Sequence, residues 1–107
     1  MWLNNKPPQK DYYAVIFASS KSDDIEGYAE MNAQMMELSQ KQKGFLGYES
    51  AGDLKNGIFI SYWESMEAID AWRKNTSHLQ AKSNAAKWYN RYLSQICKVE
   101  YTHLYEK

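Results

Sequence analysis

The hydrophobic and polar positions of this chain alternate with two different periods. Residues 12–19 are apolar at almost every position, and two further short apolar runs follow at residues 45–52 and 58–64. Successive side chains of a strand point to opposite faces, so runs of this length and pattern predict β-strands. A last run of alternating character, from residue 92 to residue 105, predicts a final long strand.

The first helix is predicted between residues 25 and 43. Asp23 and Glu26 have the spacing of a capping box, so the helix is expected to start there, and Gly44 is expected to end it. Its apolar positions recur at helical spacing and are Tyr28, Met31, Met35 and Leu38.

Two more helices are predicted between the third and the last strand. Ser65 is a good N-cap for a short helix with Ile69 and Trp72 on one side. A third helix is expected over residues 78–90. Between the second and third strands, the Asn-Gly pair at residues 56 and 57 predicts a tight hairpin.

The resulting order, β-α-β-β-α-β, predicts an α+β protein of the ferredoxin-like class, with an antiparallel sheet and its helices on one face. The strands are apolar on both sides, and the chain has no further helix to cover the second face. We therefore expect a homodimer through the sheet face. Pro7 and Pro8 favour an extended lead-in, so residues 1–11 are predicted to form an arm and residues 12–107 the domain.

Composition narrows the classes of function. The chain has 107 residues, enough for one core, and its 13 basic residues balance 13 acidic ones, which argues against nucleic acid as a partner. Cys97 is the single cysteine, so we expect a reducing, cytoplasmic setting and no thiolate metal cluster. No apolar run is long enough to predict a membrane span. Aromatic residues make up 15% of the chain, which favours a ring-lined core, interface or pocket.

Three stretches carry a resemblance to a known family. The longest runs from Ser61 to Trp72 and continues through Arg73, Lys74 and residues 78–82. Residues 13–17 and 44–50 are similar to the first strand and the helix-to-strand turn of the same family. Over nearly the whole chain from Tyr12, the sequence resembles the antibiotic biosynthesis monooxygenase (ABM) domain family, of the dimeric α/β barrel superfamily.

The resemblance implies two sheets that face each other in a dimer, with a cavity in each subunit between sheet and helices. In the oxygenases of this family the cavity takes small aromatic, often quinol-like compounds. No flavin or metal is needed there, because an electron-rich substrate anion reacts with oxygen itself, so we expect no cofactor. The protein would supply a dry pocket, hydrogen bonds and a proton acceptor.

His78 and Trp72 are the first candidates for catalytic residues. They lie six positions apart across a predicted break, and a change of direction there would bring both to one end of the cavity. His78 would accept a proton or anchor the substrate, and Trp72 would form a stacking wall. The alternative places His78 on the surface and makes Trp72 a core residue.

Four residues are candidates for substrate binding, and each also has a structural interpretation. Trp63 and Tyr62 end a strand and point to opposite faces, one expected toward the helices and one toward the dimer partner. Met31 and Met35 could form an adaptable pocket wall or simply fill the core. No group of residues has the spacing of a metal site.

Three functions remain open at this stage. The first is an ABM-type monooxygenase that acts on a small aromatic compound, although the third strand lacks the Asn that some family oxygenases use. The second is a dimeric domain that binds a small ligand without catalysis. The third is haem binding or degradation, against which Lys82 stands where that branch of the family has a His and residues 12–20 contain no Asn.

Overall fold

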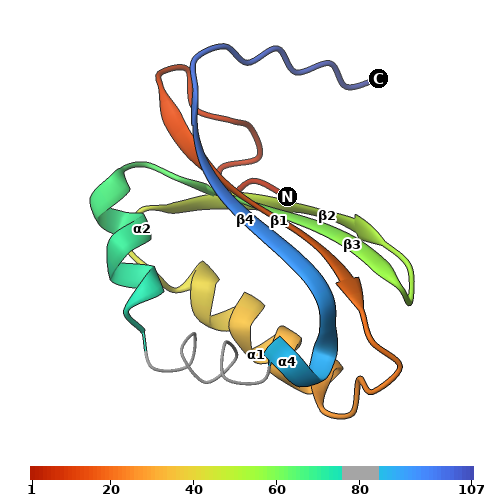
Figure 1. Ribbon diagram of the computed structural model, residues 1–107. Helices are drawn as coiled ribbons and strands as arrows, with labels where there is room; N and C mark the ends of the chain where they lie inside the picture. Colours follow the sequence, from red (N-terminus) through yellow and green to blue (C-terminus); the bar gives the residue numbers. More distant parts are fainter. Residues whose placement is uncertain (76–84) are drawn as a thin grey trace.

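The computed structural model describes residues 1–75 and 85–107, and its four strands form one antiparallel sheet. The strands are β1 (Tyr12–Lys21), β2 (Phe45–Gly52), β3 (Asn56–Trp63) and β4 (Tyr89–Val99). Their order across the sheet is β2-β3-β1-β4. The helices α1 (Tyr28–Gln40), α2 (Met66–Arg73) and α4 (Ala85–Trp88) lie on one side of it (Figure 1). The predicted ferredoxin-like class is confirmed.

Strand pairing decides which side chains face the helices. Tyr13 pairs with Trp63 and Val15 with Ser61, and this set lies on what we call the helix-side face. The alternate positions lie on the other side of the sheet, which we call the open face. Paired open-face positions of β1, β3 and β4 include Tyr12, Ala14, Ile16, Ala18, Ser20, Ile58, Ile60, Tyr62, Arg91, Leu93, Cys97 and Val99.

The core lies between one half of the helix-side face and the helices. Trp63 is fully buried, its ring is stacked on Trp72 with centroids 6.1 Å apart, and Phe45 meets it edge-on at 5.4 Å. The indole Nε1 of Trp63 donates a hydrogen bond of 2.9 Å to the hydroxyl of Ser61, which is itself buried. Ile69 of α2 completes this cluster, so the fold rests on a few large rings whose polar atoms are satisfied.

The start of α2 agrees with its prediction. Ser65 is the N-cap, and its hydroxyl accepts a hydrogen bond of 3.1 Å from the backbone N–H of Ala68. Glu67 lies in the first turn, where the helix dipole favours a negative charge.

The predicted capping box at the start of α1 is wrong. The helix begins at Tyr28 after Gly27, which has φ +82° and makes no side-chain cap. The preceding segment is held by α4 instead, because the Trp88 Nε1 donates a hydrogen bond of 3.0 Å to the backbone oxygen of Glu26. The Ser22 hydroxyl donates a second hydrogen bond, of 2.6 Å, to the backbone oxygen of Lys87. Tertiary contacts therefore override the local capping signal.

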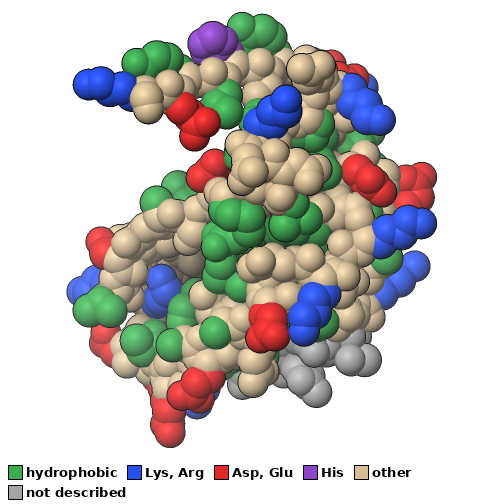
Figure 2. Space-filling model, turned by 180° about the vertical axis from the view of Figure 1, so that it is seen from behind, with side chains coloured by type: hydrophobic (Ala, Val, Ile, Leu, Met, Phe, Trp, Pro, Cys, Tyr) green, Lys and Arg blue, Asp and Glu red, His purple; other side chains and the backbone are tan. Residues whose placement is uncertain are grey.

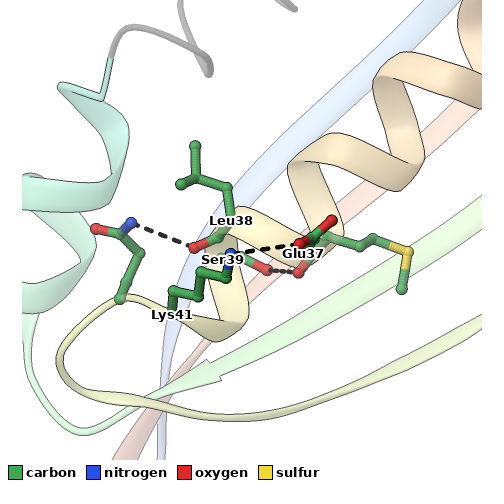
Figure 3. Close-up of polar contacts among 6 residues, drawn as sticks. Glu37, Leu38, Ser39 and Lys41 are labelled. Atoms are coloured by element: carbon green, nitrogen blue, oxygen red, sulfur yellow. Dashed lines mark hydrogen bonds and ion pairs between the residues drawn. The ribbon is translucent and has the colours of Figure 1, made fainter.

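The helix α1 also ends earlier than predicted, at Gln40 rather than Lys43. The backbone oxygen of Leu38 accepts from the Lys41 N–H at 3.2 Å and from the Gln42 side chain at 3.2 Å. Figure 3 shows the side-chain hydrogen bond to the Leu38 oxygen and the 3.3 Å ion pair between Lys41 and Glu37. Because these groups satisfy the terminal carbonyl, the chain can leave the helix before Gly44.

The hairpin between β2 and β3 is tight, but the Asn-Gly pair is not its centre. Asn56 already belongs to β3, and Gly57 pairs with Gly52. The turn is built by Asp53, whose carboxylate accepts from the backbone N–H groups of Asn56 at 2.7 Å and Lys55 at 2.8 Å. These two bonds hold the pKa of Asp53 below its usual value of 3.8.

The last strand is shifted toward the N-terminus relative to its prediction. It spans Tyr89–Val99 instead of residues 92–105, because its partner β1 begins at Tyr12, opposite Val99. Only part of the predicted helix over 78–90 lies in the described residues, and that part is α4, which ends at Trp88. Residues 100–107 have no strand partner and extend past the sheet (Figure 1).

The N-terminal residues fold onto the sheet of their own chain. Trp2 stacks on Tyr62 with centroids 4.3 Å apart and meets Tyr12 edge-on at 5.7 Å. The backbone N–H of Leu3 donates a hydrogen bond of 3.0 Å to the backbone oxygen of Leu46, so the arm runs beside β2. It covers one end of the open face. No helix among residues 1–75 and 85–107 has the length and hydropathy of a membrane span.

We expect Gly44→Ala to destabilise the protein by more than Gly27→Ala. Both glycines have positive φ, of +89° and +82°, so each substitution strains the backbone by about 1–2 kcal/mol. At Gly44 a Cβ would also lie 2.6 Å from the Cβ of Ala68, whereas at Gly27 its nearest neighbour is a Trp88 ring atom at 3.9 Å. Urea denaturation of both variants measures the difference, and equal losses would show that the turn and α2 separate without cost.

Candidate functional site

A second group of aromatic rings lies on the helix-side face, at the far end of β1 from the core. It consists of Phe17, Tyr28, Tyr89 and Tyr92, and we call it the tyrosine cluster. Phe17 stacks on Tyr92 with centroids 5.5 Å apart, and Tyr89 meets Tyr28 edge-on at 5.9 Å. Tyr92 is 49% exposed, although it lies on the same side of the sheet as the helices. The cluster therefore offers aromatic surface that the core does not use.

Three elements bring this cluster together. Phe17 comes from β1 and pairs with Ser94 of β4, so the rings of Tyr89 and Tyr92 from β4 can approach it. Tyr28 opens α1 and also meets Trp88 edge-on at 5.6 Å. A register shift between Ser20 and Lys21 lets Tyr89 pair with Lys21. This irregularity turns Tyr89 toward α1.

The electrostatics of the tyrosine cluster favour a neutral hydroxyl group on Tyr89. Burial raises the pKa of Tyr89 far above its usual value of 10.0, and a hydrogen bond with Tyr28 raises it further. The amine of Lys21 lies 5.3 Å from the centre of the Tyr28 ring, a cation–π contact. A phenol that keeps its proton can donate a hydrogen bond to a ligand oxygen.

The structure brings two of the predicted site residues together and leaves one outside the described residues. Trp72 and Trp63 stack on each other in the core, where Trp72 is 8% exposed. In these contacts both rings serve the core, which is the structural interpretation given above. His78 lies outside the described residues, so its role stays a prediction.

The other three candidates lie in different places. Tyr62 lies on the open face beneath Trp2, so the sheet separates it from Trp72. Burial raises the pKa of its hydroxyl above 10.0, with a smaller contribution from Glu49. On α1, Met35 packs against the core cluster, and Met31 is half-buried one turn closer to Tyr28. Met31 thus stands between the core and the tyrosine cluster.

Sequence reasoning missed the tyrosine cluster. The sequence pattern places Tyr28 in the apolar stripe of α1 and Tyr89 in the predicted third helix. The available signal was the Tyr-x-x-Tyr spacing of Tyr89 and Tyr92, directly before a strand that must pair with β1. That signal needed the strand boundary to be placed three residues earlier.

The described residues also form two hollows. One hollow, of about 310 Å³, lies between the arm and residues 99–104. A second, of about 570 Å³, lies at the hairpin end of the sheet. Within residues 1–75 and 85–107, no three His, Cys, Asp or Glu side chains are grouped to hold a metal ion.

We expect Tyr89→Phe to change how stability depends on pH above pH 10. The unfolded chain releases the Tyr89 proton near pH 10.0, while the folded chain keeps it to higher pH. The contribution of the protonated Tyr89 to the free energy of unfolding is therefore complete below pH 10. It is lost as the pH rises, by no more than about 1.4 kcal/mol per pH unit. Urea denaturation between pH 8 and pH 11 should give a flatter curve for Tyr89→Phe than for the wild type. Parallel stability curves for the two proteins would contradict the raised pKa of Tyr89.

Solved structures of low sequence identity share this fold. SnoaB from Streptomyces nogalater, described as a cofactor-independent oxygenase, superposes with a TM-score of 0.68 at 10% identity, over 91% of this chain and 99% of that one. A dimeric ferredoxin-like protein of unknown function from Thermobifida fusca gives a TM-score of 0.69 at 12% identity, over 89% of this chain and 97% of that one. At these identities the likeness shows the fold alone.

Sequence comparison goes further. The uncharacterized protein YqjZ of Bacillus subtilis is 42% identical over 105 residues, which cover 96% of this chain and 92% of YqjZ. The family model described as antibiotic biosynthesis monooxygenase matches residues 11–84, more than half of the chain. This chain belongs to the antibiotic biosynthesis monooxygenase (ABM) family.

Proposed function

We propose that this protein is a cofactor-independent monooxygenase that oxidises a small aromatic, quinol- or anthrone-like compound. The observation that carries the proposal is the tyrosine cluster, which presents ring surface and the protonated Tyr89 hydroxyl group on the side of the sheet that faces the helices. An aromatic ligand would stack on Tyr92 and Phe17, while Tyr28 or Tyr89 donates a hydrogen bond to its oxygen. Family membership and the oxygenase neighbour support the reaction class.

The chemistry asks little of the protein. A base removes a proton from the substrate, and the resulting electron-rich anion reacts with O₂. For an anthrone-type CH₂ group, both C–H bonds break, one oxygen atom becomes the carbonyl oxygen and the other leaves as water. The four electrons lost by carbon reduce the O₂ molecule, so no external reductant is needed. The pocket contributes by stabilising the anion through hydrogen bonds and by excluding bulk water.

The predicted site residues take separate roles in this proposal. His78 accepts the substrate proton, since an imidazole titrates near neutral pH. Trp72 closes one end of the pocket, and Trp63 holds it in place by stacking. Met31 and Met35 form the adjacent wall on α1.

One observation favours the second candidate function, a dimeric domain that binds a small ligand without catalysis. Trp72 is almost entirely buried against Trp63, so in this structure it acts as a core residue and leaves little ring surface for a substrate. Binding on the tyrosine cluster alone would not need Trp72. The reaction with oxygen separates the two functions.

We also propose that the protein forms a homodimer through the open face. Ile58 is 51% exposed and Leu93 is 42% exposed, and both lie on the side of the sheet without helices. Figure 2 shows hydrophobic side chains gathered in the middle of the molecule seen from behind. A second copy would bury this surface. Tyr62, beneath Trp2 on the same face, would then border the interface rather than the substrate. The free thiol of Cys97 on this face is compatible with a reducing compartment.

We expect purified wild-type protein to consume oxygen when it is given dithranol or a comparable anthrone, with formation of the quinone. His78→Ala should lower the turnover at least tenfold, because the substrate proton loses its acceptor. His103→Ala is the matched control, since this second histidine is exposed on the C-terminal segment. An oxygen electrode and the quinone absorbance measure both variants.

If the Tyr89 hydroxyl anchors the substrate, Tyr89→Phe should raise KM by a larger factor than it lowers kcat. Ligand binding, seen as a change of tryptophan fluorescence, without any oxygen consumption would replace the monooxygenase by the non-catalytic binding function. Equal activity of the His78→Ala and His103→Ala variants would remove His78 from the mechanism.

We expect Leu93→Lys to dissociate the dimer and Ile96→Lys to leave it intact. The two residues lie three positions apart on β4 and are similarly exposed, at 42% and 37%, but they face opposite sides of the sheet. A charge at Leu93 would have to be buried in the proposed interface, whereas a charge at Ile96 would not. Light scattering coupled to size-exclusion chromatography measures the mass. Dissociation by Ile96→Lys instead would place the interface on the helix-side edge.

A further inference from the structure

The hollow at the hairpin end lies on the open face, away from the tyrosine cluster. Ala18, Ala51 and Ile58 form its apolar floor, and Arg91 lies at its margin on β4. Its volume is about 570 Å³. None of the ion pairs among residues 1–75 and 85–107 includes Arg91. The hollow therefore presents an apolar floor beside Arg91, a cation without an ion-pair partner in the described chain. The one carboxylate in its lining, that of Asp53, is bound to backbone N–H groups of its own turn.

The C-terminal segment carries the complementary features. Residues 100–107, which we call the tail, leave the sheet after β4 and project beyond it (Figure 1). Tyr101 is 83% exposed and Tyr105 is 76% exposed, and Leu104 lies between them. Glu106 follows, and it takes part in none of the ion pairs found in the described residues. An extended segment with three large exposed apolar side chains is unusual unless a partner covers it.

We propose that the tail of each subunit docks in the hairpin-end hollow of its partner in the homodimer. Tyr105 and Leu104 would lie on the floor formed by Ala18, Ala51 and Ile58. Glu106 would then approach Arg91 of the other copy. The inference rests on the proposed homodimer and is independent of any catalytic activity.

The two-fold symmetry of a homodimer allows both tails to dock in the same way. The tail starts after Val99, which lies opposite Tyr12, while the hollow lies near Ala18 and Ser20 at the other end of β1. When two open faces meet with their strands antiparallel, the tail end of each sheet lies over the hairpin end of the other. Each tail then meets one hollow, and both contacts form at once, as a two-fold axis requires.

The hollow of the same subunit is a poorer site for the tail. From Tyr12 to Ser20 is eight residues along β1, or about 26 Å at 3.3 Å per residue. The tail leaves β4 in the opposite direction, and its eight residues reach at most about 26–29 Å when fully extended. It would have to double back flat along the whole open face and cover the surface that the second copy needs.

The size of the sheet also favours a contribution from the tail. Four strands at about 4.8 Å spacing and about 26 Å of paired length give the open face a flat footprint of about 500 Å². A stable interface buries roughly 800 Å² from each partner. An extended tail docked on the partner increases the contact area on both sides of the axis.

Cross-linking between two differently tagged copies tests the proposal. Both copies carry Cys97→Ser, one adds His103→Cys in the tail, and the other adds Ala51→Cys in the hollow. These positions are exposed, and the changes leave Tyr101, Leu104, Tyr105 and Glu106 intact. The copies are co-expressed, purified through both tags and treated with a short bis-maleimide. The control pair replaces Ala51→Cys by Gln34→Cys, which is exposed on α1.

We expect a covalent heterodimer from the His103→Cys and Ala51→Cys pair, with at least a fivefold lower yield for the Gln34→Cys control. Arg91→Glu should lower the yield, and Glu106→Arg combined with it should restore the yield. A heterodimer by light scattering that gives no cross-link above the control would overturn the docked tail and leave the homodimer standing. A monomer would overturn both.

Discussion

The contact between Trp63 and Trp72 is the constraint on which the rest of this structure depends. Trp63 ends β3 and Trp72 lies in α2, so their stacking fixes the angle at which the chain leaves the sheet. Phe45 closes the other side of the Trp63 ring, and Ser61 satisfies its indole N–H. Losing a ring of this size from a core costs about 3–5 kcal/mol, a large part of the stability of a domain this small. Trp63 therefore cannot be spared for substrate binding, and a ligand must stack on other rings.

That constraint divides the helix-side face into two parts with different tasks. Near the start of β1, large rings and α2 form a dry core, and Gly44 lets the turn approach α2 closely. Near the end of β1, Tyr89 and Tyr92 lie against Phe17 with part of their surface exposed. Met31 stands at the boundary between them. A ligand that stacks on the second part, as proposed, would leave the packing of the first unchanged, so the proposed binding and the folding stability would depend on different rings of one sheet.

The sequence was sufficient for the fold because the signals that define it are local and repeated. Apolar strand runs, the Ser65 cap and the helical stripe of α1 each specify their element, and the ferredoxin-like order follows from their succession. The predicted ends of helices and strands were wrong where a contact with a distant residue sets them. Trp88 binds the backbone of Glu26 and so delays α1, and the end of β4 is set by where β1 begins. The tyrosine cluster was missed for the same reason. A register shift between β1 and β4 turns Tyr89 toward α1, and the periodicity of the sequence does not predict that shift.

The two edges of the sheet show why the second copy is expected on one side only. The arm runs beside β2, where Leu3 donates to Leu46 and the N–H of Tyr48 donates to the oxygen of Met1, so part of that edge already has its hydrogen bonds. Gly47 makes this possible, since a Cβ there would overlap the same Met1 oxygen. The opposite edge, β4, pairs only with β1 within the described sheet and has exposed side chains along most of its length. An edge strand left open with apolar residues on both faces invites association. With the β2 edge covered, the proposed second copy would bind at β4, the open face beside it and the tail that continues from it.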